Sequence, residues 1–276
     1  MIEDEISRKN SLYWEELCGT HLATVLGIEG VDEDSLKIFD EWYFRMYPYL
    51  FDHIPLREMA KKNVLEVGLG FGSVSQKIAE SGANYSGLDI ASKASWMANH
   101  RLALQGLNGK AVVGSVLDAP FPDGSFDYIV TIGCLHHTGD LQKAIDECYR
   151  MLRDGGTLVL MLYYAYSARR WYQNPRETSR YLLSELLGYR GVVHRQDTRD
   201  RYLYDHNADG EAAPHTDFVS IKSLRKMGSK FSSFTCRIEN IMPEPPLGRW
   251  IKEREKHLGD RFVRTLGLDI YATLKK

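Results

Sequence analysis

Three glycines at alternate positions are the residues of this sequence that most directly suit binding of a nucleotide-like ligand. Gly68, Gly70 and Gly72 follow the apolar run 64–67 and precede the helix-compatible run 73–80. Only glycine lets a tight strand-to-helix turn bring its backbone close to such a ligand. The spacing therefore predicts a buried strand, a ligand-binding turn and a helix.

An acid stands about twenty residues further on, where a ribose-binding residue is placed in folds of this kind. Asp89 ends the second predicted strand, 84–88. A carboxylate at that strand end can accept hydrogen bonds from a ribose diol. The glycines and the acid together predict a nucleotide or nucleoside cofactor.

Three histidines are candidates for acid–base chemistry. His136 and His137 follow the fourth predicted strand, and His215 stands two residues before Asp217 in a predicted loop. The unperturbed pKa of histidine suits a general base that takes a proton from a hydroxyl group. A structural reading stays open beside the catalytic one: these side chains would then shape the cofactor pocket or hold a loop.

The elements that must position these residues alternate between strand and helix. The predicted strands are 63–67, 84–88, 110–114, 126–132 and 157–163, and the predicted helices are 73–81, 92–105 and 140–152. Strand–helix–strand units of this kind cross over right-handedly, and the carboxyl ends of their parallel strands bind ligands. We therefore expect an α/β fold with a turn at 153–156 before the fifth strand.

This succession resembles the class I S-adenosylmethionine-dependent methyltransferases, and within them the branch of ubiquinone/menaquinone-type and other small-molecule enzymes. The segments LEVGLGFG, GLDI, GSVLDAPFPDGSFDYIV and GCLHHTGDLQKAIDECYRMLRDGGTLVL agree with it in order and spacing over about residues 61–163. A dinucleotide fingerprint would need its third small residue at Ser73, whereas this chain has Gly72. The glycine spacing therefore favours adenosylmethionine over a nicotinamide cofactor.

The resemblance implies a doubly wound, mostly parallel seven-stranded sheet whose last strand runs antiparallel. It also implies S-adenosylmethionine as the cofactor, S-adenosylhomocysteine as the product and no metal. The glycine turn would pass beside the amino-acid and ribose parts of the cofactor, with Glu66 orienting it, and Asp89 would bind the ribose hydroxyls. The other implied cofactor contacts are Ile90, Ser115, Val116, Thr131 and Gly133. Aspartate is common in the family where Ser115 stands, and a hydroxyl group is the weaker acceptor.

The flanking segments do not identify a member of the family. We expect an N-terminal helical cap (1–60), the cofactor-binding core (61–163), a substrate-covering insert (164–217) and a segment that completes the sheet (218–276), all within one structural domain. In the cap, Ser11 is an expected helix N-cap, and Asp34 or Ser35 is expected to start a longer helix that ends before Pro48. The aromatic residues of the cap either pack on the sheet or line the substrate pocket.

The insert is the segment in which we expect the substrate to be specified. Its basic residues are all arginine, a side chain that suits bidentate capture of a carboxylate or phosphate on an anionic acceptor. In the alternative reading, most of them pair with acids of the insert itself. The candidate substrate contacts are Tyr163, Tyr166, Arg169, Arg195, Tyr204 and Asp217.

Composition narrows the possible partners. Thirty-five lysines and arginines against 37 acids give a net charge of −2, which counts against nucleic acid. Four scattered cysteines without C-x-x-C spacing fit a reducing cytoplasm, and no run approaches the ~18 apolar residues of a membrane span. The predicted protein is cytoplasmic, and its proline-rich segment 243–250 is a candidate pocket rim or homo-oligomer contact.

We therefore expect methyl transfer to a small-molecule acceptor in a biosynthetic pathway. Oxygen acceptors come first because of the histidines, and nitrogen or carbon acceptors follow. One alternative is an RNA-directed methyltransferase that uses the arginines and tyrosines of the insert. The other is a protein that binds the cofactor without transferring its methyl group.

Overall fold

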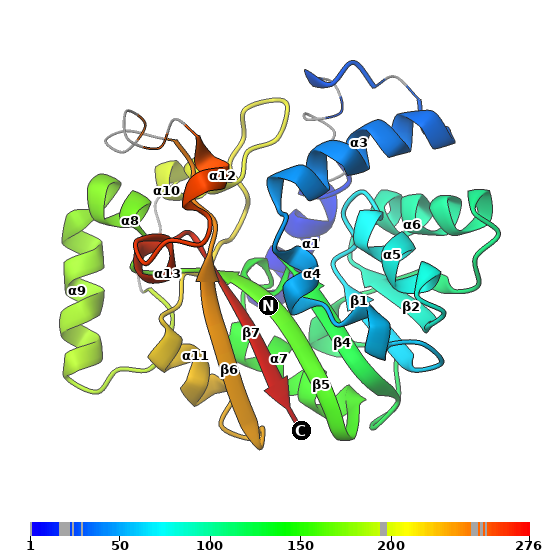
Figure 1. Cartoon of the computed structure of the whole chain (residues 1–276). Coiled ribbons are helices and arrows are strands. Elements are labelled where there is room, and N and C mark those ends of the chain that lie inside the picture. The colour runs from blue at the N-terminus through cyan, green and yellow to red at the C-terminus, as the bar shows by residue number, and fades with distance from the viewer. Residues whose placement is uncertain are drawn as a thin grey trace.

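A single sheet organises the chain. The computed structural model describes residues 2–16, 23, 25–28, 30–193, 198–243, 248, 251 and 253–276. Within these ranges, seven strands form one sheet in the order β3-β2-β1-β4-β5-β7-β6 (Figure 1). Strands β1 to β5 are parallel, and β7 runs antiparallel to both of its neighbours. The predicted doubly wound, mostly parallel sheet is confirmed.

The strand bounds agree closely with the predicted ones, with two exceptions. Strand β5 begins earlier than expected because Leu152 pairs with Phe126 ahead of a register shift, so the predicted turn at 153–156 belongs to the strand. Strand β7 begins later than expected because a short helix ending at Leu266 precedes it. The strands are β1 (Asn63–Val67), β2 (Asn84–Asp89), β3 (Lys110–Val113), β4 (Phe126–Ile132), β5 (Leu152–Tyr163), β6 (Ser233–Glu239) and β7 (Asp269–Lys275).

Helices connect and flank the strands. The α-helices are α1 (Ile2–Tyr13), α3 (Glu33–Met46), α4 (Leu50–His53), α5 (Ser73–Glu80), α6 (Ser92–Leu104), α7 (Leu141–Met151), α8 (Ala168–Gln173), α9 (Pro175–Leu186), α10 (Thr198–Tyr204), α11 (Ile221–Met227), α12 (Arg254–His257) and α13 (Val263–Leu266). The described residues also form the 3₁₀ turns η1 (Leu56–Glu58), η2 (Val116–Asp118) and η3 (Leu135–His137).

The start of each N-terminal helix differs from the predicted one. Helix α1 begins well before Ser11, whose hydroxyl donates to the carbonyl of Arg8 inside the helix, so Ser11 is not its N-cap. Helix α3 is capped by Asp32, which accepts a hydrogen bond from the backbone N–H of Ser35 at 3.0 Å. The carboxylate of Asp32 satisfies a helix-terminal N–H that the predicted start would have left without a partner.

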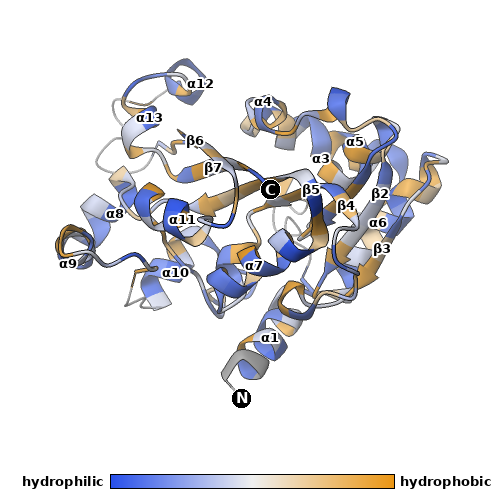
Figure 2. Ribbon diagram, turned by 90° about the horizontal axis from the view of Figure 1, so that it is seen from below, coloured by the Kyte–Doolittle hydropathy of each residue, from blue (hydrophilic) through white to orange (hydrophobic). Residues whose placement is uncertain are grey.

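The two faces of the sheet are packed by different helices, as Figure 2 shows from below. Side chains alternate across each strand, so Leu65 joins the cluster that includes residues of α7 and α11, whereas Val64 joins the cluster that includes residues of α4 and α5. Each fully buried aliphatic side chain contributes about 1.5–3 kcal/mol. The two clusters pack both faces of the sheet, so the carboxyl ends of the parallel strands lie along one edge of it.

Two further features bear on the expected cellular setting. No helix in the described ranges is both long enough and apolar enough to cross a membrane. Cys148 and Cys236 are free thiols, and Cys18 lies outside the described residues.

A buried arginine fastens the N-terminal helices to the glycine turn. Arg101 of α6 is fully buried, and its two terminal nitrogens each donate to a carboxylate oxygen of Asp40 in α3 at 2.9 Å. Its Nε atom donates to the carbonyl of Phe71 at 2.6 Å. The ring of Phe71 in turn stacks on Phe39 of α3, with 4.1 Å between centroids. Helix α3 is therefore held against the loop that follows β1.

Replacing Asp40 with alanine would leave the Arg101 guanidinium buried without its counter-charge. We expect Asp40→Ala to lower the free energy of unfolding by about 3–5 kcal/mol, measured by denaturant titration. The neighbouring, exposed Glu41 provides the control, since Glu41→Ala should change stability by less than about 0.5 kcal/mol. Similar losses in the two variants would contradict the role given to this ion pair.

Candidate functional site

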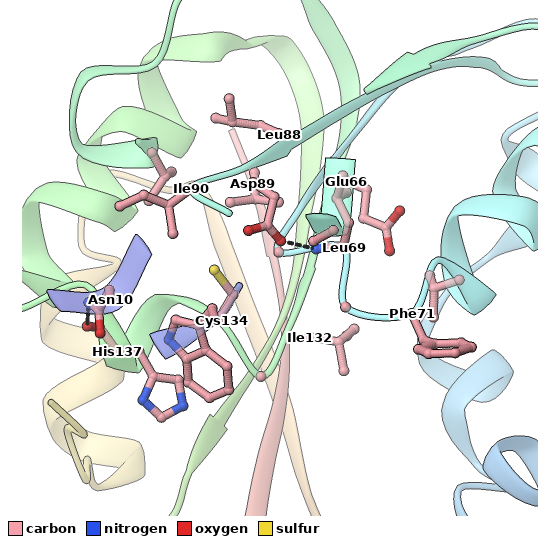
Figure 3. A pocket seen from close by; sticks show the side chains of 18 of the residues that line it. Asn10, Glu66, Leu69, Phe71, Leu88, Asp89, Ile90, Ile132, Cys134 and His137 are labelled. Atoms are coloured by element: carbon pink, nitrogen blue, oxygen red, sulfur yellow. Dashed lines mark hydrogen bonds between the residues drawn. The ribbon is translucent and has the colours of Figure 1, made fainter. Parts of the chain in front are cut away.

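A cavity of about 370 Å³ lies at the carboxyl ends of β1, β2 and β4. Its walls come from the glycine turn, the segments that follow β2, β3 and β4, and the N-terminal helices α1 and α3 (Figure 3). The volume is within the range of sites that hold small molecules. The ligand-binding end of the sheet therefore carries a pocket, as the positions of the motifs predicted.

The glycine turn adopts a backbone that other residues disfavour. Gly68, Gly70 and Gly72 have φ values of 80°, 50° and 75°. A Cβ atom on Gly68 would collide with the side chain of Cys134, and one on Gly72 would lie 2.9 Å from Arg101 Cδ. Glycine is therefore required both by conformation and by close packing, and all three residues line or border the cavity.

Asp89 joins the two loops that form one wall of the cavity. Its carboxylate accepts hydrogen bonds from the backbone N–H of Leu69 at 2.7 Å and from that of Ala91 at 2.8 Å (Figure 3 shows the first). Burial raises the pKa of Asp89. A carboxylate offers about four acceptor positions, so Asp89 retains acceptor capacity for a hydroxyl group of a ligand in the cavity.

Glu66 is a buried acid beneath the glycine turn. Its Oε2 atom accepts hydrogen bonds from the hydroxyl groups of Ser75 at 2.6 Å and Tyr85 at 2.8 Å. Burial raises the pKa of Glu66 to about 8. The side chain reaches the cavity wall and ties β1 to β2 and α5, a position that agrees with its expected role of orienting the turn.

Most of the other expected cofactor contacts also reach the cavity. Ile90, Ser115, Val116 and Gly133 line it, whereas Thr131 is fully buried and does not. Ser115 Oγ accepts a hydrogen bond from the N–H of Leu117 at 3.2 Å and so caps η2. The oxygen keeps a second lone pair for a ligand.

His137 is the histidine that faces the cavity. Its Nδ1 atom lies 2.7 Å from the carbonyl oxygen of His215, so this nitrogen carries the proton and donates it. The Nε2 atom has no hydrogen-bond partner among the described residues and is the basic nitrogen of that tautomer. Burial lowers the pKa of His137, which favours the neutral ring at pH 7.

His136 and His215, the other two candidate bases, do not line the cavity. His136 is fully buried, its ring lies 4.2 Å from the rings of both His137 and Tyr163, and neither of its nitrogens finds a partner in the described part of the chain. His215 Nε2 lies 3.0 Å from Asp217 Oδ1, so the expected His–Asp pair is present, but neither residue lines the cavity. Over the same ranges, no group of three metal-ligating side chains is placed to hold a metal ion.

The N-terminal helices supply the aromatic wall. The ring of Trp14 lies 5.0 Å from the ring of His137, and Asn10 Nδ2 donates to the His137 carbonyl at 2.6 Å. The aromatic residues of the cap pack on the core and also line the cavity. Lining aromatic residues from this region are Trp14, Phe39, Trp42, Tyr43 and Tyr47. Sequence reasoning missed Asn10, Phe71 and Cys134, since an isolated polar or apolar side chain carries no pattern.

The described residues of the insert (164–217) do not line the cavity. Figure 1 shows α8 and α9 beside β6, at the opposite edge of the sheet from α6. Arg169 donates to the carbonyl of Leu203 at 3.0 Å and lies over the ring of Tyr204, and Tyr163 donates to Asp205 at 3.0 Å. Tyr166 packs on Tyr181, and Arg195 lies outside the described residues. The expected substrate contacts are thus engaged within the insert and with β5.

The raised pKa of Glu66 has a consequence for stability. Between its ordinary pKa of 4.5 and about 8, the folded protein binds a proton that the unfolded chain has lost, so the free energy of unfolding falls as the pH rises. We expect Glu66→Gln to remove a slope of up to about 1.4 kcal/mol per pH unit in this window, measured by urea titrations from pH 5 to 8. The exposed Glu80→Gln should keep the wild-type slope, and an unchanged slope in Glu66→Gln would refute the assignment.

Comparison with known proteins agrees with this geometry. Residues 65–160 match the family described as "Methyltransferase domain". Ajmaline N-methyltransferase of Rauvolfia serpentina is 34% identical over 107 residues, which cover 38% of this chain and 37% of that protein. Demethylmenaquinone methyltransferase of Tropheryma whipplei (strain Twist) is 34% identical over 102 residues, covering 37% and 41%. The chain thus matches about two fifths of the length of these relatives.

Solved structures show the same fold. A SAM-dependent methyltransferase from Methanosarcina mazei superposes with a TM-score of 0.52 at 19% sequence identity, over 83% of this chain and 97% of that one. The matched domain spans strands β1 to β5, which carry the glycine turn and Asp89. Residues 65–160 of this chain therefore match a methyltransferase domain, and the sheet that contains them has the fold of a SAM-dependent methyltransferase.

Proposed function

We propose that this protein transfers a methyl group from S-adenosylmethionine to a small molecule bound in the same cavity. The observation that carries the proposal is the Asp89 carboxylate, which stands in the cavity wall, fixed by two backbone N–H groups, with acceptor positions left over. A ribose diol supplies the two donors that this arrangement lacks. The relatives named for ajmaline and demethylmenaquinone support a small-molecule acceptor and a biosynthetic role.

The residues around the cavity fit this cofactor. We assign the ribose hydroxyls to Asp89, the adenine to Ile90 and Val116 with Ser115 at its edge, and the amino-acid part to the glycine turn above Glu66. Gly133, whose φ of 75° turns the chain at the end of β4, borders the reacting end. When bound, the cofactor supplies a methyl group on a positively charged sulfur atom.

The acceptor that suits the rest of the cavity is uncharged. Aromatic residues of α1 and α3 dominate that part of the wall, and none of the described lining residues is lysine or arginine. Several arginines of the insert contact other groups; for example, Arg170 lies 3.5 Å from Asp200, and Arg201 donates to the Ala213 carbonyl. An anionic acceptor and an RNA substrate both lack support for the same reason.

His137 is the residue we assign as general base for a hydroxyl acceptor. Its tautomer presents Nε2 as the basic nitrogen, and its lowered pKa keeps the ring neutral and able to take a proton. These features support oxygen as the methylated atom ahead of nitrogen or carbon, since a free amine needs little help from a base.

Binding of the cofactor is tested with S-adenosylhomocysteine and isothermal titration calorimetry. We expect wild type to bind and Asp89→Ala to lose at least about tenfold in affinity, since charge-assisted hydrogen bonds are each worth about 1.5–3 kcal/mol. Asp118→Ala is the matched control because Asp118 is exposed and lies outside the cavity lining. The absence of wild-type binding would refute the proposed function.

Methyl transfer itself is tested with methyl-labelled cofactor and fractionated cell extract, which also identifies the acceptor. On that acceptor, we expect His137→Gln to reduce turnover by about 10²–10⁴-fold, the usual contribution of a general base. His215→Gln should cost less than about tenfold, because His137 uses only the backbone carbonyl of His215. Full turnover in His137→Gln would exclude His137 as the base.

A further inference from the structure

We propose that Asp205, which follows helix α10 in the insert, is the residue that stabilises His137 once this base has taken the proton of the acceptor. The inference rests on the proposed function. Asp205 Oδ2 lies 3.6 Å from His137 Nε2, on the side of the ring away from the His215 carbonyl contact at Nδ1. The side chain of Asp205 is 18% exposed and that of His137 is 5% exposed, so water screens the pair weakly.

One carboxylate oxygen of Asp205 accepts a hydrogen bond, and the other has no hydrogen-bond donor among the described residues. Oδ1 accepts a hydrogen bond from the hydroxyl of Tyr163 at 3.0 Å, which sets the orientation of the carboxylate. Oδ2 is buried and has no hydrogen-bond partner within the described residues. A buried acceptor left without a donor destabilises the folded protein. Protonation of His137 at Nε2 would place a positive charge 3.6 Å from this oxygen.

The ring of His137 is held with Nε2 near Asp205. Nδ1 donates to the His215 carbonyl, and Trp14 packs against the ring, so rotation about the side chain is blocked. During transfer, the acceptor oxygen bonds to the methyl carbon, the carbon–sulfur bond breaks with its electron pair left on sulfur, and the hydroxyl proton passes to Nε2. The resulting imidazolium then directs one N–H at the His215 carbonyl and has Asp205 beside the other.

The surrounding charges favour Asp205 over its neighbours as this partner. Burial lowers the pKa of His137, and Asp205 is the strongest of the groups that raise it again. The pKa of Asp205 is raised by burial and lowered by His137 and the Tyr163 hydroxyl, with smaller effects from Arg169 and His206.

The remaining titratable groups near His137 are engaged elsewhere or act against its charge. Asp217, the other acid nearby, lies 3.0 Å from His215 Nε2 and has the weaker effect on the pKa of His137. His215, when charged, opposes protonation of His137. His136 is coupled to the same ring, which lowers the pKa of His136 itself. Asp205 is thus the nearest carboxylate with a free oxygen.

The test is the titration of His137 by nuclear magnetic resonance in the full-length protein with S-adenosylhomocysteine added. Histidine is isotopically labelled, and the His137 signal is assigned by its loss in His137→Gln. We expect Asp205→Asn to lower the pKa of His137 by about 1–3 units, the usual effect of removing an opposite charge at this range. Asp217→Asn is the matched control and should lower it less.

Two further variants keep the test decisive if Asp205→Asn fails to fold by circular dichroism. Asp205→Glu should restore most of the wild-type titration, and Tyr163→Phe should shift the pKa of His137 in the same direction as Asp205→Asn but by less. An unchanged titration in the Asp205 variants, or a larger shift in Asp217→Asn, would overturn the inference.

Failure of this inference can be told apart from failure of the proposed function. If methyl transfer depends on His137 but the pKa of His137 is unchanged in the Asp205 variants, only the assignment of Asp205 as the partner of His137 is wrong. If wild type transfers no methyl group to any extract fraction, the proposed function is wrong, whatever the titration shows.

Discussion

The structure depends on one carboxylate that holds two loops together. Asp89 accepts the backbone N–H of Leu69 in the glycine turn and that of Ala91 before α6, and so fixes the cofactor wall across two strands. The turn has the left-handed backbone that only glycine adopts easily, and this conformation needs an outside acceptor for its free N–H groups. Asp89, which the sequence predicts to bind a ribose, therefore also shapes the binding site in the absence of a ligand.

The remaining parts of the site are built around this wall from segments far apart in the chain. Glu15, just after α1, accepts the N–H groups of Ser92 and Lys93 at the start of α6, while Glu16 accepts that of Ala208 in the insert. The N-terminal segment thus links the cofactor side to the insert and lines part of the cavity. The insert contacts His137 through the His215 carbonyl and Asp205, which influence the protonation of its ring. None of its described arginines lines the cavity.

The sequence predicted the core well because its signals are local. Strand β1, the three glycines and Asp89 each follow from a short pattern with one physical cause, and the structure places them as expected. Sequence reasoning could not choose among the histidines, since the choice depends on a contact between His137 and the carbonyl of His215, 78 residues away. We also expected the insert to cover the substrate, and none of its described residues lines the cavity. A cluster of arginines and tyrosines has the same sequence pattern whether it binds a ligand or its own acids.

A crystal structure of the complex with S-adenosylhomocysteine tests the central claim most directly. We predict that the ribose hydroxyls lie within hydrogen-bond distance of both Asp89 oxygens and that the adenine lies between Ile90 and Val116. We also predict that the sulfur atom lies beside Gly133, with the side that carries the methyl group in the cofactor directed toward His137 and Trp14. A ligand bound elsewhere, or one whose ribose does not contact Asp89, would contradict it.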